Sequence, residues 1–78
     1  MHPAVTKVKV IEDHKLRVSF ENGEQGELDM TPYLDFGVFS RLKNPQIFNQ
    51  VTISFKTIEW PCGVDLDPEF VYEKTVKR

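Results

Sequence analysis

The sequence has few of the residues from which catalytic and metal-binding sites are usually built. It contains one cysteine and two histidines among 78 residues, so a disulfide cannot form within the chain. Its apolar runs are far shorter than the ~20 residues that a membrane-spanning helix needs. The sequence also lacks the pattern of a signal peptide. Together with the unpaired cysteine, this absence predicts a cytoplasmic protein without a membrane segment.

The sequence also has no large excess of positive or negative charge. The formal net charge is −2 and the pI is about 5.6, which gives no overall attraction to nucleic acid or to acidic lipid. The composition, 40% hydrophobic and 28% charged, is typical of a globular protein. A chain of this length forms one small hydrophobic core, so we predict a single domain over residues 1–78.

The clearest pattern in the first half is a hairpin. Residues 15–20, KLRVSF, alternate apolar and polar side chains, as a half-buried strand does, and Asn-Gly follows at 22–23. A two-residue turn there would mix apolar with charged side chains on each face. A three-residue loop over 21–23, with Gly23 left-handed, pairs 20 with 24, 18 with 26 and 16 with 28. Leu28 and Met30 then join the apolar face, so we predict this register.

Residues 5–11, VTKVKVI, predict an earlier strand, with a turn at residues 12–14. Its buried face has two possible compositions, either Val8 with Val10 or Val5 with Ile11. The first places the intervening lysines in water and is therefore preferred. The two strands and the one that follows the hairpin form a three-stranded meander.

This preference gathers four basic side chains on the solvent face of the sheet: Lys7, Lys9, Lys15 and Arg17. A basic two-stranded ribbon can bind a groove of DNA. The third strand opposes this interpretation, because Asp29 is expected opposite Lys15, and Glu27 two residues along from the position opposite Arg17. Ion pairing on a solvated face is a sufficient explanation, so direct nucleic-acid binding is an alternative hypothesis.

Three helix starts in the second half share one device, in which a capping residue precedes a proline. They are Thr31-Pro32, Asn44-Pro45 and Asp67-Pro68. The first predicts a short turn closed by Gly37 and followed by an apolar helical stripe of Val38, Phe39 and Leu42. The second predicts a short helix that docks Ile47 and Phe48. The third predicts a C-terminal helix over residues 68–76.

Residues 51–60 alternate with a period of two, and Ile58 and Trp60 share one face, as do Val51, Ile53 and Phe55. They form either a tight hairpin around residues 55–57 or one long bent strand. The whole order predicts a small α+β domain. It consists of an antiparallel three-stranded meander, short helices, a second two-stranded element and a C-terminal helix.

The stretch EWPCGVDLDPEF, residues 59–70, contains the lone Cys62 and three closely spaced carboxylates. A catalytic cysteine needs a base, but no spacing connects Cys62 to His2 or His14. An EF-hand needs a glycine and a distant glutamate that are missing here. We therefore predict no catalytic residue, no metal site and no cofactor.

A structural interpretation accounts for most of the same stretch. Trp60 ends a strand, Pro61 stops its hydrogen-bond ladder, and Gly63 takes a turn conformation. Leu66 then returns to the core while Asp67 caps the C-terminal helix. Asp65 is left without a capping role, so the motif stays open to either a structural or a binding function.

The motif W-P-x-G-x-D-L-D-P-E with a following tyrosine resembles the signature of the bacterial family called domain of unknown function 2442. The matching residues are Trp60, Pro61, Gly63, Asp65, Leu66, Asp67, Pro68, Glu69 and Tyr72. The similarity covers nearly the whole chain, including the F-x-N-G hairpin and the D-M-x-P-Y-L segment with its F-x-x-L continuation. Cys62 and Lys56 depart from that pattern, and the first departure argues against a shared cysteine mechanism.

The resemblance implies a small α+β fold with no established catalytic activity. Relatives occur alone or joined to a helix-turn-helix domain, and are often encoded beside a second small protein, as in toxin–antitoxin pairs. We therefore expect a non-enzymatic interaction or regulatory module, antitoxin-like, whose partner is another small protein. A homodimer through a sheet edge is also open. The alternatives are a direct nucleic-acid-binding regulator and an enzyme using Cys62, Asp65 and Asp67.

Overall fold

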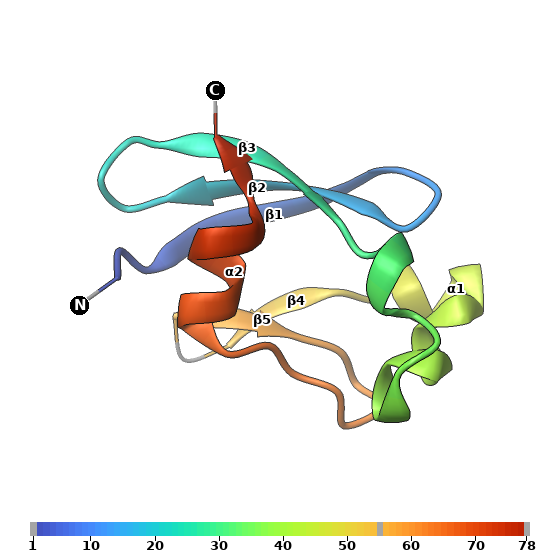
Figure 1. The fold of residues 1–78 in the computed structure, drawn as a ribbon. Coiled ribbons are helices and arrows are strands. Elements are labelled where there is room, and N and C mark those ends of the chain that lie inside the picture. The colour runs from blue at the N-terminus through green and yellow to red at the C-terminus, as the bar shows by residue number, and fades with distance from the viewer. Residues whose placement is uncertain (1, 55, 78) are drawn as a thin grey trace.

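The larger of two sheets has four antiparallel strands in the order β1-β2-β3-β6 (Figure 1). The computed structural model describes residues 2–54 and 56–77. The strands of this sheet are β1 (Val5–Glu12), β2 (Lys15–Phe20), β3 (Gln25–Asp29) and β6 (Val76–Lys77). The predicted meander is therefore confirmed, with a fourth strand added at its far edge.

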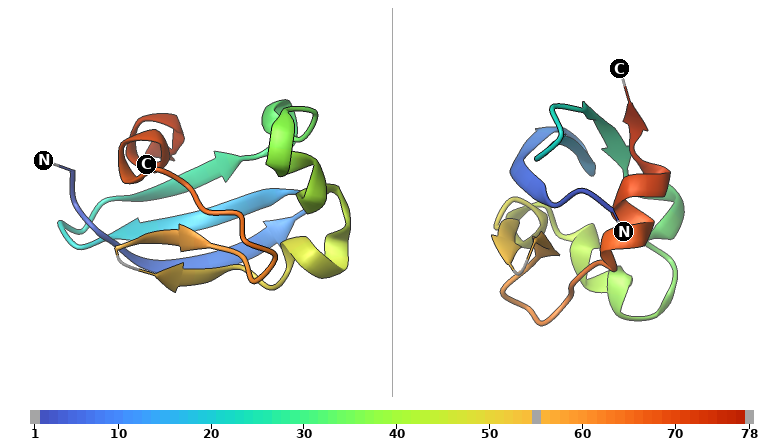
Figure 2. Two further views of the ribbon diagram at one scale, coloured as in Figure 1. Left: turned by 90° about the horizontal axis from the view of Figure 1, so that it is seen from below. Right: turned by 90° about the vertical axis from the view of Figure 1, so that its left-hand side faces the viewer.

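The other elements pack against the inner face and the ends of this sheet. They are the 3₁₀ helices η1 (Thr31–Tyr33) and η2 (Gly37–Lys43), the helices α1 (Pro45–Phe48) and α2 (Pro68–Lys74), and the hairpin β4 (Thr52–Ser54) with β5 (Thr57–Glu59). The hairpin lies across from the larger sheet, while α2 lies at the end of the molecule that holds the N-terminal segment (Figures 1 and 2). Helices η1, η2 and α1 lie at the opposite end. The predicted α+β class is confirmed.

The predicted register of β2 and β3 is also confirmed. Leu16 pairs with Leu28 and Val18 with Gly26, and the Phe20 N–H donates to the Glu24 carbonyl at 2.8 Å. Gly23 has φ of 89°, a left-handed conformation that costs glycine little. Glu27 lies directly opposite Arg17, not two residues along, because the pairs 16–28 and 18–26 leave 27 facing 17.

Strand β1 directs valines from both of the predicted alternatives toward the core. Val8 faces Val18 and Val10 faces Leu16, as preferred, but Val5 faces Phe20 and is buried as well. Irregular pairing between Val5 and Lys7 shifts the alternation by one residue, as a bulge does. A strict period of two could not have placed all three valines on one face.

The C-terminal helix is shorter than predicted. It ends at Lys74, and Val76 lies in β6 opposite Glu27. The neighbouring pair, Gly26 with Lys77, explains the glycine in β3: a Cβ built there would lie 2.1 Å from the Val76 carbonyl oxygen. Glycine in a strand often marks such a close approach of another backbone.

Two of the three proline-marked starts form as predicted. The side-chain oxygens of Asn44 and Asp67 accept from the N–H of the second residue after them, at 2.9 and 2.8 Å. The prediction for Thr31 is wrong. Thr31 lies inside η1, and its N–H donates to Asp29 Oδ1 at 2.9 Å.

Burial raises the pKa of Asp29, but the hydrogen bonds from Thr31 and the charge of Lys15 outweigh this effect, so the net shift of the Asp29 pKa is downward.

The helical stripe predicted after Gly37 is partly wrong. The segment forms the 3₁₀ helix η2, in which Leu42 is buried and Phe39 half-buried, while Val38 is exposed. A 3₁₀ helix has three residues per turn, so three positions spaced for an α-helix cannot share one face.

Residues 51–60 form the hairpin rather than the long strand. Ser54 pairs with Thr57 and Ile53 with Ile58, so Thr57 belongs to β5 rather than to the turn. Lys56 has φ of 72°, a conformation that few non-glycine residues adopt. Ile53 is 40% exposed, and Phe55 of the same predicted face lies outside the described residues.

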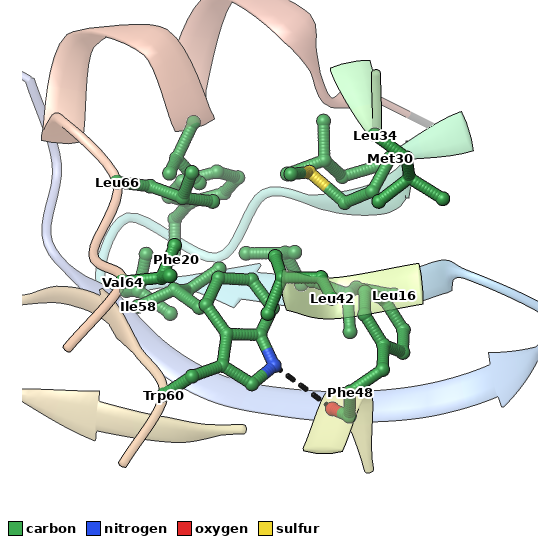
Figure 3. Close-up of a cluster of buried hydrophobic side chains, with 14 residues drawn as sticks. Leu16, Phe20, Met30, Leu34, Leu42, Phe48, Ile58, Trp60, Val64 and Leu66 are labelled. Atoms are coloured by element: carbon green, nitrogen blue, oxygen red, sulfur yellow. Dashed lines mark hydrogen bonds between the residues drawn. The ribbon is translucent and has the colours of Figure 1, made fainter. Parts of the chain in front are cut away.

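The hydrophobic core fills the space between the two sheets (Figure 3). Trp60 lies in its centre and is 1% exposed, with side chains of both sheets, η2, α1 and α2 around it. Leu34, Leu42 and Phe48 close the end of the core near α1. The short helices, which cannot be stable alone, are therefore held by the residues they contribute to this core.

The substitution Gly26→Ala tests the approach of β6 to β3. The added methyl collides with backbone atoms of Val76 and Lys77, so β6 must move away. We expect the free energy of unfolding in urea to fall by about 1–3 kcal/mol, as for other overpacked sites. Gln25→Ala, at the exposed neighbouring position, is the control. Equal stability of the two variants would contradict the account of Gly26.

Candidate functional site

The motif residues 60–66 form a tight turn that folds back onto β5. The Gly63 N–H donates to the Trp60 carbonyl at 3.1 Å, and the Trp60 N–H donates to the Val64 carbonyl at 2.8 Å. Gly63 has φ of 90°, as its predicted turn role requires. The Leu66 N–H then donates to the Ile58 carbonyl at 3.0 Å. The strand ladder thus resumes after the exposed Pro61 instead of stopping there.

Trp60 anchors this turn to α1. Its indole Nε1–H donates to the Phe48 carbonyl at 2.8 Å (Figure 3), and the two rings lie 5.6 Å apart between centroids. Phe48 in turn contacts the ring of His14 edge-on at 5.0 Å. Nε2 of His14 lies 2.9 Å from the Leu42 carbonyl oxygen and 3.1 Å from that of Lys43. The sequence predicted His14 in a turn but gave no signal for this contact, which spans 28 residues.

Three further motif residues build the start of α2. Leu66 is buried, Asp67 caps the helix through the N–H of Glu69, and Pro68 is its first residue. This is the predicted strand-to-helix joint. Asp65 contributes a backbone bridge to Glu59, and its side chain is exposed.

Cys62 is half-buried, and the structure brings neither histidine to it. Its carbonyl oxygen accepts a hydrogen bond from Arg41 Nη1 at 3.0 Å. His14 is held by the carbonyls at the end of η2, and Nε2 of His2 lies 3.6 Å from Glu69 Oε1. Within residues 2–54 and 56–77, no three side chains of histidine, cysteine, aspartate or glutamate are placed to hold a metal ion.

The motif tyrosine connects α2 to the β2–β3 hairpin. The Tyr72 hydroxyl donates to Glu24 Oε1, which also accepts from Asn22 Nδ2 at 2.6 Å. The hydrogen bond from Tyr72, followed by that from Asn22, lowers the pKa of Glu24. The same bond with Glu24 raises the pKa of Tyr72, since the neutral phenol is its donor. Two separate parts of the family pattern, the F-x-N-G hairpin and the tyrosine, therefore meet here.

Groups from both ends of the chain surround the Tyr72 ring. The rings of Phe20 and His2 lie 5.1 and 5.5 Å from it between centroids. Lys77 Nζ lies 4.0 Å from the ring centroid and donates to the Tyr72 carbonyl. The lysine thus binds the end of α2 and stacks a cation on its aromatic ring. The arrangement fixes α2 against the sheet. The Tyr72 hydroxyl and the Glu24 carboxylate are hydrogen-bond partners of each other.

The four basic side chains occupy the solvent face of the sheet, as predicted, with Lys9 opposite Arg17. Arg17 lies 3.6 Å from Glu27 and Lys15 lies 3.6 Å from Glu12. Two of the four charges are therefore opposed by carboxylates. Such exposed pairs contribute little to stability, but they reduce the positive potential of the face.

The family described as "Protein of unknown function (DUF2442)" has a model that matches residues 5–77. The chain belongs to this family. No curated protein and no solved structure matches it. The matched region runs from the first residue of β1 to the last of β6, so the family pattern covers the complete fold. The helices of residues 2–54 and 56–77 lack the length and apolar character needed to cross a membrane.

Substitutions of Asp67 distinguish a capping residue from a metal ligand. Asparagine and serine also cap helices, so Asp67→Asn and Asp67→Ser should be nearly silent in thermal denaturation, while Asp67→Ala should cost ~1 kcal/mol. A ligand that binds the native state must stabilise it, so Ca²⁺, Mg²⁺ or Mn²⁺ should leave Tm unchanged. An ion-dependent rise in Tm that Asp67→Asn abolishes would overturn the capping account.

Tyr72→Phe tests the hydrogen bond to Glu24 through its pH dependence. The pKa of Glu24 lies below its ordinary value of 4.5, so the stabilisation is present above pH 4.5 and is lost as pH falls through the lowered pKa. The pKa of Tyr72 lies above 10.0, so on the alkaline side the contribution persists to pH 10.0 and is lost above it. The variant should lose the alkaline dependence and should keep only the weaker acid dependence that the hydrogen bond from Asn22 to Glu24 supplies.

An NMR titration of the Glu24 carboxyl carbon measures the effect directly. In Tyr72→Phe the pKa of Glu24 should rise toward 4.5. Tyr33→Phe is the matched control, because Tyr33 packs on Phe70 at 5.0 Å and has no contact with Glu24 among the described residues. An unchanged Glu24 titration in Tyr72→Phe would show that the bond is absent in solution.

Proposed function

We propose that this chain is a non-enzymatic protein-interaction module and that residues 36–38, which end the connection from η1 and begin η2, form its contact surface; we call them the apolar loop. The observation that carries the proposal is the exposure of Phe36, 66%, and Val38, 54%. Scattered exposed apolar residues are common, but two large ones around a single glycine form a local patch. Large aromatic side chains are also the residues that dominate binding energy at protein interfaces.

The apolar loop is held in place by its neighbours. The Phe36 N–H donates to the Tyr33 carbonyl and the Phe39 N–H donates to the Phe36 carbonyl, both at 3.1 Å. An ion pair of 2.7 Å between Lys43 Nζ and Asp35 closes the loop across η2. A surface fixed before binding loses less conformational entropy when a partner docks. The loop is thus suited to recognition.

The family motif lies next to the apolar loop and supports it. Arg41, in η2, donates to the carbonyl of Cys62 at 3.0 Å, so the turn of residues 60–64 braces the later part of the helix that begins in the loop. The other motif side chains serve the core, the cap of α2 and the bond to Glu24. Because these roles are architectural, the motif supports an interaction module better than an enzyme.

The partner in this proposal is a second small protein, and the role is regulatory, as in the antitoxin-like arrangement that the family resemblance implies. Direct nucleic-acid binding has less support. Binding to phosphates depends on clustered, unneutralised cations, whereas Arg17 and Lys15 lie beside Glu27 and Glu12.

The test uses the product of the gene adjacent to the one that encodes this chain. Its affinity for the wild-type chain is measured by calorimetry and compared with that for Phe36→Ser/Val38→Ser. We expect the double variant to bind roughly tenfold or more weakly, with the same Tm as the wild type. Val76→Ser, which removes an equally exposed valine (66%) from β6, should bind normally. Equal weakening by both variants would refute the assignment of the surface.

A further inference from the structure

A groove lies at the opposite end of the molecule from the apolar loop. We call it the N-terminal groove: it has a volume of about 380 Å³ and is lined by residues 2–4, Lys56 and residues 67–69. Figures 1 and 2 place the N-terminal segment and the start of α2 at one end, and the η1–η2 connection at the other. One chain therefore carries an exposed apolar loop at one end and a groove at the other.

The N-terminal groove matches the apolar loop in size and chemistry. Its volume falls at the lower end of the range for pockets that hold small organic groups, ~300–1,000 Å³, which is sufficient for one aromatic side chain. Pro3, Ala4 and Pro68 supply apolar lining. The other two motif residues that line it, Asp67 and Glu69, are exposed and lie outside the core.

Charge also favours the match. Asp67 and Glu69 border the N-terminal groove against a single lysine, Lys56, and Glu69 Oε1 lies 3.6 Å from Nε2 of His2. Arg41 and Lys43 flank the apolar loop against a single Asp35. The groove end is thus net negative and the loop end net positive, and such complementarity guides association and fixes orientation.

We infer that the N-terminal groove of one copy of this chain receives Phe36 of a second copy in a head-to-tail contact. This inference rests on the proposed function, because it uses the same apolar loop, and it adds a second copy of the chain as a further partner of that loop. The contact is heterologous, so in a pair one copy keeps an unused loop and the other keeps an unused groove, and association continues unless the geometry closes a ring. One loop in one small groove makes a contact below the standard interface size, so the Kd is on the order of 100 µM.

Sedimentation measured from about 10 µM to about 1 mM protein, a range that spans this Kd, tests the inference. We expect the average mass of the wild type to rise with concentration, and to rise less at high salt because the flanking charges are screened. Phe36→Ser removes the inserted side chain, and Ala4→Trp fills the groove. Each variant alone should stay monomeric. Val76→Ser should associate like the wild type.

A mixture of the two variants gives the sharpest result. The Phe36→Ser chain retains its groove and the Ala4→Trp chain retains its loop, so an equimolar mixture should form dimers and nothing larger. If Ala4→Trp does not fold, Glu69→Lys, an exposed substitution that reverses the charge of the rim, takes its place and should weaken association.

A wild-type mass that stays monomeric over the whole range would overturn the inference, as would association that neither the loop variant nor the groove variant changes. The proposed function is judged separately. If the wild type is monomeric and Phe36→Ser/Val38→Ser still loses affinity for the neighbouring gene product, the interaction surface stands and the self-association falls.

Discussion

The fold depends on burying a single tryptophan between two small sheets. A domain of 78 residues has few core positions, and Trp60 occupies the central one while its indole N–H reaches the carbonyl of Phe48. That bond satisfies the polar atom that a buried tryptophan carries. It also fixes α1 relative to the turn that follows β5, so the two halves of the molecule are positioned by one side chain.

Patterns between neighbouring residues could be read from the sequence, and contacts between distant segments could not. Alternation placed Leu16 and Leu28 on one face and fixed the β2–β3 register, because a slip of one residue would expose the apolar side chains. Asn44 and Asp67 were predicted as caps because the bond they accept is local. Strand β6 was missed since two residues carry no periodicity, and its partner position is visible only as an otherwise unfavourable Gly26.

In the candidate site, too, the sequence predicted the local contacts and missed those between distant segments. The sequence predicted the joint between Trp60 and α2, with the roles of Gly63, Leu66 and Asp67. It could not show that Tyr72 reaches Glu24, 48 residues away. Nor could it show that Val38, placed on an apolar stripe, points into solvent, since a 3₁₀ helix and an α-helix of the same sequence bury different residues. The proposed contact surface therefore includes Val38, a residue that α-helical spacing had assigned to the buried stripe.

His14 illustrates how the backbone can decide the chemistry of a side chain. The two oxygens beside its Nε2 belong to the carbonyls of Leu42 and Lys43, and carbonyl oxygens can only accept hydrogen bonds. Nε2 must therefore carry hydrogen, which fixes the neutral imidazole in one tautomer and leaves Nδ1 with the lone pair. The same residue holds φ of 58° in the β1–β2 turn. Asparagine would suit that backbone, but its shorter side chain would not span the distance to η2, so two separate requirements select histidine at this position.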